Sequence, residues 1–299
     1  MKKKLNLYVL TTLLFMININ YCIAQDPASK EILNTRKYKE SAFRIGVNYS
    51  NDYVYAGRKD SIASPYITPY LSYFHKSGFF TRASISYLTA KSEARIDLSS
   101  LMLGYSFNGE YLFGGVNTNI FFFNAKSYAV QSEINASANG YLGYGISGFD
   151  LSVDISTLIG KELDIMTGVE LSKSIYADKD RVQISPTIYT IAGTQHYYNE
   201  YYVIRGSNSV SRSGRKGRGG SITQPVTQTT VMINESSAFK LLAVDLSMPI
   251  HYTINKVRLS FLPAYAIPIN PSSITIDQTT KTEDIKNVFY FTVGISIKI

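Results

Sequence analysis

Hydrophobic and polar residues alternate with a period of two along much of the chain, most clearly between Asn287 and Ile299. One side of this segment carries Phe289, Phe291, Val293, Ile295, Ile297 and Ile299, and the other carries Tyr290, Thr292, Gly294, Ser296 and Lys298. Successive side chains of a β-strand point to opposite faces. The pattern therefore predicts a strand with one apolar face and one polar or tightly packed face.

Earlier runs show the same alternation, and each predicts one more antiparallel strand. With the closing segment, the twelve runs span about residues 43–49, 67–73, 79–87, 95–105, 112–122, 130–138, 151–156, 165–172, 182–189, 242–251, 257–267 and 289–299. In the fourth run the apolar side changes near Ser99 and Ser100, which predicts a β-bulge there. The even number of runs is what a single-chain bacterial barrel requires, because both ends of the barrel then lie on the periplasmic side.

The connections between runs differ in length in a regular way. Short, turn-rich segments fall near 76–78, 108–109, 177–179 and 253–255, whereas the three longest connections span about 51–64, 194–237 and 270–286. The short segments follow even-numbered runs and the long ones follow odd-numbered runs, while loops two to four are short. This distribution predicts an up-and-down barrel with tight turns at one end and longer loops at the other.

Composition narrows the class of protein. No stretch after residue 24 has the 18 or so uninterrupted apolar residues that a membrane helix requires. The chain has 24 tyrosines, 15 phenylalanines and no tryptophan, which favours strands. Tyrosine and phenylalanine must then form any interfacial girdle, and those near predicted strand ends are Tyr49, Tyr66, Tyr73, Tyr87, Tyr141, Tyr252 and Phe289.

The N-terminus has the features of a secretory signal peptide, 1–24. Three lysines precede an apolar stretch, and Ala24 supplies the small residue before a cleavage site predicted between Ala24 and Gln25. An uncleaved anchor helix is the alternative, but Asn18 and Asn20 interrupt the apolar run. Cleavage lowers the formal charge from +8 to +5 and removes the single cysteine, so the mature chain has no thiol for disulfides, metal ligation or nucleophilic catalysis. Residues 25–41 are polar and form a periplasmic lead-in.

The chain resembles the Gram-negative outer-membrane β-barrel proteins of porin type. The resemblance lies in the exported chain, the alternating runs and the closing strand, and it covers 42–299. It implies an all-β transmembrane antiparallel barrel in the cell outer membrane, with membrane lipid and lipopolysaccharide as surroundings. In that family a terminal strand ending in an aromatic residue is recognised by the barrel assembly machinery, whereas this chain ends in Ile299.

A soluble β-sandwich or a closed lipocalin-like barrel is the rival fold. Those folds bury apolar side chains inward and expose polar ones to water. The polar faces here hold mostly serine, threonine, asparagine and glycine rather than lysine and glutamate, as expected of an internal lumen. The sequence therefore favours the membrane barrel.

Charged residues at predicted inward positions fall on two sides of the barrel. The basic wall is Arg44, Arg82, Arg95, Arg258 and Lys298, and the acidic wall is Glu133, Asp154, Glu170 and Asp245, with Asp97 among the basic residues. Opposed walls could create a transverse field that orients polar solutes. Alternatively, the charges pair along or across the wall, because an isolated charge in a low-dielectric interior is costly.

The long fifth loop contains a basic tract of Arg205, Arg212, Arg215, Lys216 and Arg218 among glycines and serines. Such a tract could bind the phosphates of lipopolysaccharide head groups. It could also be a solvated loop, or fold into the lumen toward the acidic wall. Nucleic acid is not an expected partner on an outer surface.

Enzymatic interpretations have little support. His75, His196 and His251 lie on different elements, and none shows the spacing of a zinc site. His196, near the outer end of a predicted strand, lacks the His-x-Ser-type pairing of outer-membrane lipid-modifying enzymes. The glycines between Gly143 and Gly148 match a nucleotide-binding spacing, but no helix follows, so we predict a turn. We therefore expect no enzyme, no cofactor and no metal site.

Three functional hypotheses remain. The first is a passive channel for small polar solutes. The second is a structural or surface-interaction barrel with a filled lumen and no transport. The third, with the least support, is a lipid-modifying outer-membrane enzyme.

Overall fold

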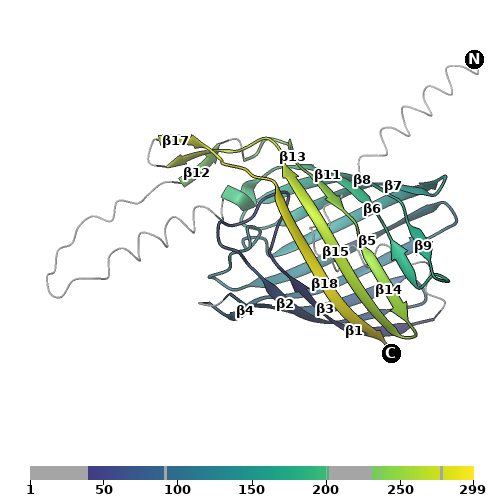
Figure 1. Ribbon diagram of the computed structural model, residues 1–299. Helices are drawn as coiled ribbons and strands as arrows, with labels where there is room; N and C mark the ends of the chain where they lie inside the picture. The colour runs from purple at the N-terminus through teal and green to yellow at the C-terminus, as the bar shows by residue number, and fades with distance from the viewer. Residues whose placement is uncertain (1–39, 91–92, 200, 202–230, 235, 277–278) are drawn as a thin grey trace, which may run out of the picture.

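A closed antiparallel ring of twelve strands forms the protein in the computed structural model, which describes residues 40–90, 93–199, 201, 231–234, 236–276 and 279–299 (Figure 1). The strands of the ring are β1 (Ala42–Ser50), β2 (Tyr66–Phe74), β3 (Phe79–Leu88), β4 (Arg95–Asn108), β5 (Leu112–Phe123), β6 (Ala136–Ile146), β7 (Phe149–Ile159), β8 (Leu163–Ser172), β11 (Thr187–Gly193), β13 (Lys240–Ser247), β15 (Val257–Pro268) and β18 (Val288–Lys298). The predicted twelve-stranded barrel is confirmed.

The ring closes where β18 meets β1. The paired residues run from Arg44 opposite Lys298 to Ser50 opposite Thr292, and the other edge of β18 pairs with β15. The ladder continues past the strand end, since the Phe43 and Ile299 backbones exchange two hydrogen bonds. No edge of β18 is left open, so its backbone groups are satisfied without water.

The outer surface of the ring is apolar and the inner surface is polar. On β18, Phe289 is 58% exposed while its neighbour Tyr290 is 6% exposed. Exposed large apolar side chains occur on each of the twelve strands. A surface of this kind is stable against lipid rather than water, and the chain is therefore a β-barrel of the outer-membrane class.

Three further segments extend ring strands beyond interruptions. β9 (Ile175–Ala177) continues β8, β10 (Val182–Ile184) leads into β11, and β14 (Ile250–Ile254) continues β13. A separate three-stranded sheet contains β12 (Val231–Asn234), β16 (Ser273–Ile276) and β17 (Thr279–Thr282). A short helix begins at His196. In the described residues, no helix has the length and apolar content needed to cross a membrane.

Turns and loops separate to the two ends of the barrel. Short turns at 75–78, 109–111, 147–148, 178–181 and 255–256 lie at one end, and positive φ angles at Gly78, Ser147, Gly148 and Asn255 fit such turns. The opposite end carries loops that we name L1 (51–65), L3 (124–135), L5 (194–239) and L6 (269–287). In barrels of this class the short turns face the periplasm, so the looped end is the outer end.

The sixth predicted strand was placed too early. β6 begins at Ala136, and the alternating residues from 130 to 135 belong to L3, where Val130 and Ile134 are buried inside the ring. Glu133 therefore lies in a loop and not on a strand. An alternating pattern indicates that the apolar residues avoid water, but it does not show whether they face lipid or a protein interior.

Two bulges change which side chains point inward. Along β4 the register skips Asp97, two positions before the predicted bulge, and along β13 it skips Leu242, which was expected to face lipid. Both side chains are buried inside the ring. Tyr66 and Tyr141 also lie on the inward side, so they are not part of an interfacial girdle. The predicted signal peptide and most of the lead-in lie outside the described residues.

The lipid-facing side of β18 gives a test of the membrane assignment. We expect Val293→Lys, at the middle of this strand, to lower the free energy of unfolding by about 2–4 kcal/mol, because a charge at the bilayer midplane loses its hydration. The control Ile299→Lys, at the end of the barrel, should cost about 0–1 kcal/mol. Urea unfolding in lipid vesicles measures both, and equal effects of the two variants would contradict the assignment.

Candidate functional site

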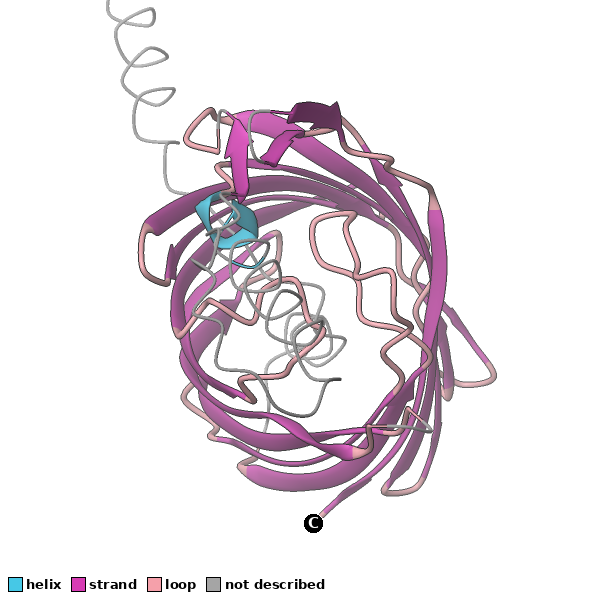
Figure 2. Ribbon diagram, turned by 90° about the vertical axis from the view of Figure 1, so that its left-hand side faces the viewer, coloured by secondary structure: helices cyan, strands magenta, loops and turns pink. Residues whose placement is uncertain are grey.

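L1 enters the ring as a tight hairpin. Tyr55 and Arg58 exchange backbone hydrogen bonds of 2.8 and 2.9 Å around Ala56 and Gly57, whose φ angles are 47° and 75°. Two central residues with positive φ define a two-residue hairpin turn, and glycine suits the second position. A Cβ at Gly57 would also collide with Ala243 on the wall. Viewed along the barrel, loops lie within the ring of strands (Figure 2).

The hairpin joins an apolar core inside the outer half of the barrel. Residues from L1, L3 and the start of L5 pack against inward residues of the wall. The loop residues are Tyr55, Ala56, Val130, Ile134, Tyr197, Tyr198 and Tyr201, and the wall residues are Leu158, Met166, Tyr189, Ile191, Leu242 and Ala243. We name these three loop segments, 51–65, 124–135 and 194–201, the outer plug. The core residues named above are at most 4% exposed, so the outer plug fills this part of the lumen.

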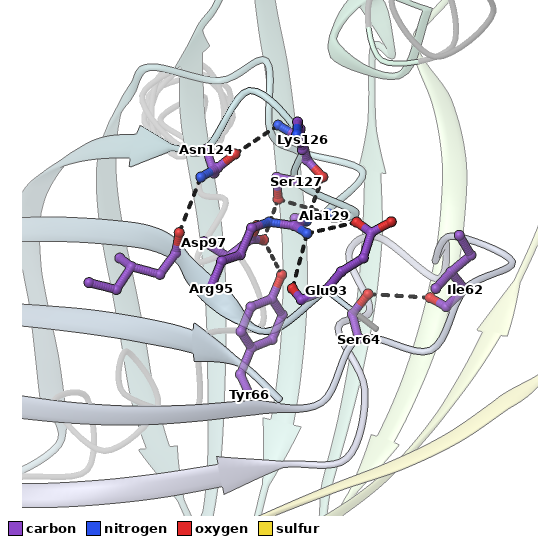
Figure 3. Close-up of polar contacts among 11 residues, drawn as sticks. Ile62, Ser64, Tyr66, Glu93, Arg95, Asp97, Asn124, Lys126, Ser127 and Ala129 are labelled. Carbon is purple, nitrogen blue, oxygen red and sulfur yellow. Dashed lines mark hydrogen bonds and ion pairs between the residues drawn. The ribbon is translucent and has the colours of Figure 1, made fainter. Parts of the chain in front are cut away.

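Asp97 fastens L3 to the wall (Figure 3). Its carboxylate accepts hydrogen bonds from Tyr66, from Ser127 Oγ at 2.6 Å and from Arg95 Nε at 2.8 Å. Arg95 also donates to the Lys126 carbonyl at 2.5 Å. The bulge at Asp97 turns this carboxylate inward, where several donors replace its lost hydration.

Asp164 fastens the start of L5 to the wall. It accepts bonds from Thr194 Oγ1 at 2.6 Å and from the backbone N–H groups of His196 and Tyr197 at 2.8 and 2.7 Å. These are the contacts of a residue that caps a helix N-terminus. His196 Nδ1 lies 3.0 Å from Asp164, and its Nε2 lies 3.4 Å from Glu162. The histidine is therefore held between carboxylates in a structural position.

Arg58 ties L1 to L6 across the mouth. Its guanidinium donates to the carbonyls of Leu242 at 3.3 Å and Asn270 at 3.2 Å, and its Nε lies 3.5 Å from Glu283. The same carboxylate accepts the Tyr198 hydroxyl at 2.6 Å. Buried ion pairs contribute little net stability, but removal of one partner leaves an uncompensated charge. This arrangement therefore favours one position of the loops.

Below the outer plug, four of the predicted basic residues share one side of the lumen. Register places Arg82, Ser72, Arg44 and Lys298 in one row across β3, β2, β1 and β18, and Arg258 lies on the adjacent β15. The Arg82 guanidinium stacks on Tyr70 at 3.6 Å from the ring centre. Arg95 is not in this group, because it lies at the outer end with Asp97.

Two of the three acidic residues on strands, Asp154 and Glu170, lie on the far side of the ring, whereas Asp245 lies on β13 next to β15, the strand of Arg258. Asp154 is on β7, Glu170 on β8 and Asp245 on β13, and register places Tyr189 between the last two. The Tyr189 hydroxyl donates to Asp154 at 2.7 Å. Since β7 is diametrically opposite β1 in a ring of twelve, Asp154 and the adjacent Glu170 face the basic residues across the lumen, and Asp245 does not. Glu133, in L3, is not part of this group.

A neutral amide and hydroxyl wall connects the two charged groups. Asn139 donates to Asn117 at 2.7 Å, Asn119 donates to the same oxygen at 3.1 Å, and Ser156 bonds to Asn139. These residues occupy inward positions of β5, β6 and β7. They were not singled out from the sequence, although they fill the polar positions of the alternation.

Two other predictions concern residues or groups that the structure describes only in part. The basic tract from Arg205 to Arg218 lies outside the described residues. Among the residues that are described, no group of three or more histidine, aspartate or glutamate side chains could hold a metal ion.

Removal of the Asp97 carboxylate should release L3. We expect Asp97→Ala to cost about 3 kcal/mol, because Arg95, Tyr66 and Ser127 lose a common buried acceptor. Local opening should then free the backbone around Lys126, whose side chain is already exposed, and trypsin should cleave there about tenfold faster or more. The control Glu93→Ala removes a more exposed carboxylate 2.9 Å from the same guanidinium, and should stay within about twofold of the parent protein. Equal cleavage rates in both variants would contradict the role of Asp97.

Comparison with known proteins finds similarity to solved structures and not to known sequences. No protein-family model matches it, and no curated protein sequence does. The solved structures that it is similar to include the KdgM porin (TM-score 0.43, 6% identity, 86% of this chain and 99% of that one) and the NanC porin (0.47, 7%, 86% and 100%). LpxR from Salmonella typhimurium is another (0.41, 12%, 85% and 99%). At these values, the assignment to the outer-membrane β-barrels rests on the closed ring and apolar exterior of this chain.

Proposed function

We propose that the protein is an outer-membrane channel for small polar solutes whose outer entrance is closed by the outer plug in this conformation. The observation that carries the proposal is the polar inner wall, with basic and acidic groups opposed across an amide-lined lumen. Contact with lipid explains why the exterior is apolar, but a barrel in lipid does not need a lumen lined by charged and amide side chains. Such a wall suits passage of hydrated, charged or zwitterionic solutes.

Size restricts the solutes to small molecules. Twelve strands spaced about 4.8 Å apart and tilted about 40° give a backbone radius near 12 Å. Inward side chains such as Arg82 and Tyr70 occupy part of that radius. Folded proteins and large polymers would not pass.

Passage requires movement of the outer plug. Backbone hydrogen bonds to the wall hold the ends of L1 and L3, whereas side-chain contacts hold their central parts, which can move while the ring stays intact. The polar contacts at Arg58, Asp97 and Asp164 are discrete and could switch between a closed and an open arrangement. We infer a gated channel and no enzymatic activity, since His196 serves as a partner of Asp164.

A barrel that stays closed is the second candidate function. The observation in its favour is the tyrosine-rich core of the outer plug, which is packed like a protein interior. Such a barrel would act through its surface loops. In either case we infer lipid and lipopolysaccharide as its surroundings and recognition of β18 by the barrel assembly machinery.

Single-channel recording in planar bilayers separates the two candidates. We expect rare, brief openings from the parent protein and at least about tenfold more open time from Arg58→Ala, because Glu283 and Tyr198 lose the cation that holds L1 in place. Arg181→Ala, which removes an exposed cation from a periplasmic turn, is the control and should leave gating unchanged. Absence of openings in all three proteins would overturn the channel and favour the closed barrel.

The opposed charges predict ion selectivity. In the Arg58→Ala background, Arg44→Gln should shift the reversal potential in a salt gradient toward cation selectivity. Glu170→Gln should shift it in the opposite direction, because each variant removes one sign of charge from the lumen. Shifts of the same sign, or none, would show that solutes do not pass between these two groups.

A further inference from the structure

Three prolines lie close together in neighbouring strands of the barrel wall, and two of them fall where a strand is interrupted. The ladder between β11 and β13 ends at Thr187 and Ser247, and pairing resumes between β10 and β14 only at Ile184 and Ile250. Pro186 and Pro249 lie in this gap, and Pro263 lies on the adjacent β15. Proline cannot donate a hydrogen bond, so an uninterrupted ladder is impossible here.

The prolines still accept hydrogen bonds from their neighbours. Lys173 donates its backbone N–H to Pro186 at 3.2 Å, Ser185 to Pro249 at 2.9 Å and Met248 to Pro263 at 3.1 Å. The wall is therefore closed here, although the regular ladder is interrupted. The irregularity recurs on adjacent strands, so it extends across several strands of the wall and is not confined to one residue.

The outward surface at this interruption is hollowed. A groove of about 500 Å³ crosses the strands, lined by Phe149, Leu171, Ile188, Leu246, Tyr265 and Phe289. Its volume is within the range of roughly 300–1,000 Å³ that ligand sites occupy. These side chains belong to the exposed belt of the barrel, so the medium that reaches the groove is lipid.

Lys173 lies at the end of the groove nearest the short turns. Its Nζ is 4.8 Å from the ring centre of Phe149, the first residue of β7 after the turn at 147–148. The neighbouring Ser174 bonds to the inward Ser185 at 3.1 Å, which places Lys173 on the outward side. Lys173 directly follows β8, and the outward positions within the described strands of the ring carry uncharged residues.

A cation on the lipid-facing surface needs an anionic partner. Lysine on this face is unfavourable in hydrocarbon and tolerated near the interface, where its stem can lie along apolar side chains. Lys173 lines the apolar groove and lies at the periplasmic side, where the lipid head groups carry phosphate. An acyl chain in the groove would bring such a phosphate to the lysine.

We propose that this groove is a binding site for an anionic phospholipid of the periplasmic leaflet, with one acyl chain in the groove and its phosphate paired with Lys173. Burial of the acyl chain against the apolar lining favours binding, and the charge of Lys173 selects an anionic head group. The site lies outside the lumen, so it does not depend on transport.

The absence of tryptophan from the chain allows a single introduced indole to report on the site. Phe149→Trp places it beside Lys173. Phe79→Trp is the matched control, because Phe79 also begins a strand after a short turn and faces lipid outside the groove. Each variant is folded into phosphatidylcholine vesicles with a minor fraction of brominated phosphatidylglycerol, and heat-modifiable gel mobility confirms folding.

We expect the brominated lipid to be enriched about fivefold beside the Phe149→Trp indole relative to the Phe79→Trp indole, which is seen as stronger fluorescence quenching. Addition of Lys173→Gln to Phe149→Trp should lower the quenching to the level of the control. Equal quenching at the two positions would overturn the proposal. An excess that survives Lys173→Gln would also overturn it, since the groove would then take any acyl chain without selecting the head group.

Discussion

The structure depends on one constraint, which is that every backbone polar group within the membrane must find a partner in the protein. A row of unpaired N–H and C=O groups in hydrocarbon costs several kcal/mol per group, so a sheet in lipid has to close on itself. The pairing of β18 with both β1 and β15 meets this requirement. Once the ring is closed, alternate side chains of each strand face opposite sides, so its apolar residues face lipid and its polar residues face the lumen. Even where prolines interrupt the wall, their carbonyls accept the neighbouring N–H groups.

The outer plug is attached to the wall at places where the strand ladder is irregular. At Asp97 and Leu242 the ladder skips a residue, and each bulge directs one additional side chain inward. Asp97 then holds L3, and Leu242 packs beneath L1 while its carbonyl accepts Arg58. Local irregularity of the wall therefore determines where the loops dock. Because the docking contacts are buried carboxylates and a guanidinium, they define a single closed position, and the loss of any one of them is costly.

Most of the fold could be predicted from the sequence, and its exceptions have a common cause. Strand positions such as Phe43, Phe79 and Ile295 were identified correctly because lipid imposes a strict period of two. Val130, Ile134 and Leu242 were misplaced, since an apolar residue satisfies the same pattern whether it faces lipid or the outer plug. Tyr66 and Tyr141 were misplaced for the same reason, because tyrosine suits both an interface and a packed lumen.

Less of the candidate site than of the fold could be predicted from the sequence. Opposed positions of Arg44 and Asp154 follow from strand order alone, so they could be anticipated. The roles of Asp52, Asp97 and Asp164 could not, because each binds loop groups whose positions depend on how the loop folds. Asp52, for example, accepts the Ser64 backbone N–H at 3.0 Å across L1. Nothing in the spacing of these residues distinguishes a buried loop anchor from a solvated aspartate.

Hydrogen exchange of the barrel folded in lipid tests the central claim most directly, namely that L1 is docked as a hairpin inside the ring. The account predicts that the backbone amides of Tyr55 and Arg58, which are bonded to each other, exchange as slowly as amides in the strands of the wall. Exchange of these two amides at the rate of an unstructured loop would contradict it, and would leave only L3 and the start of L5 over the outer end of the lumen.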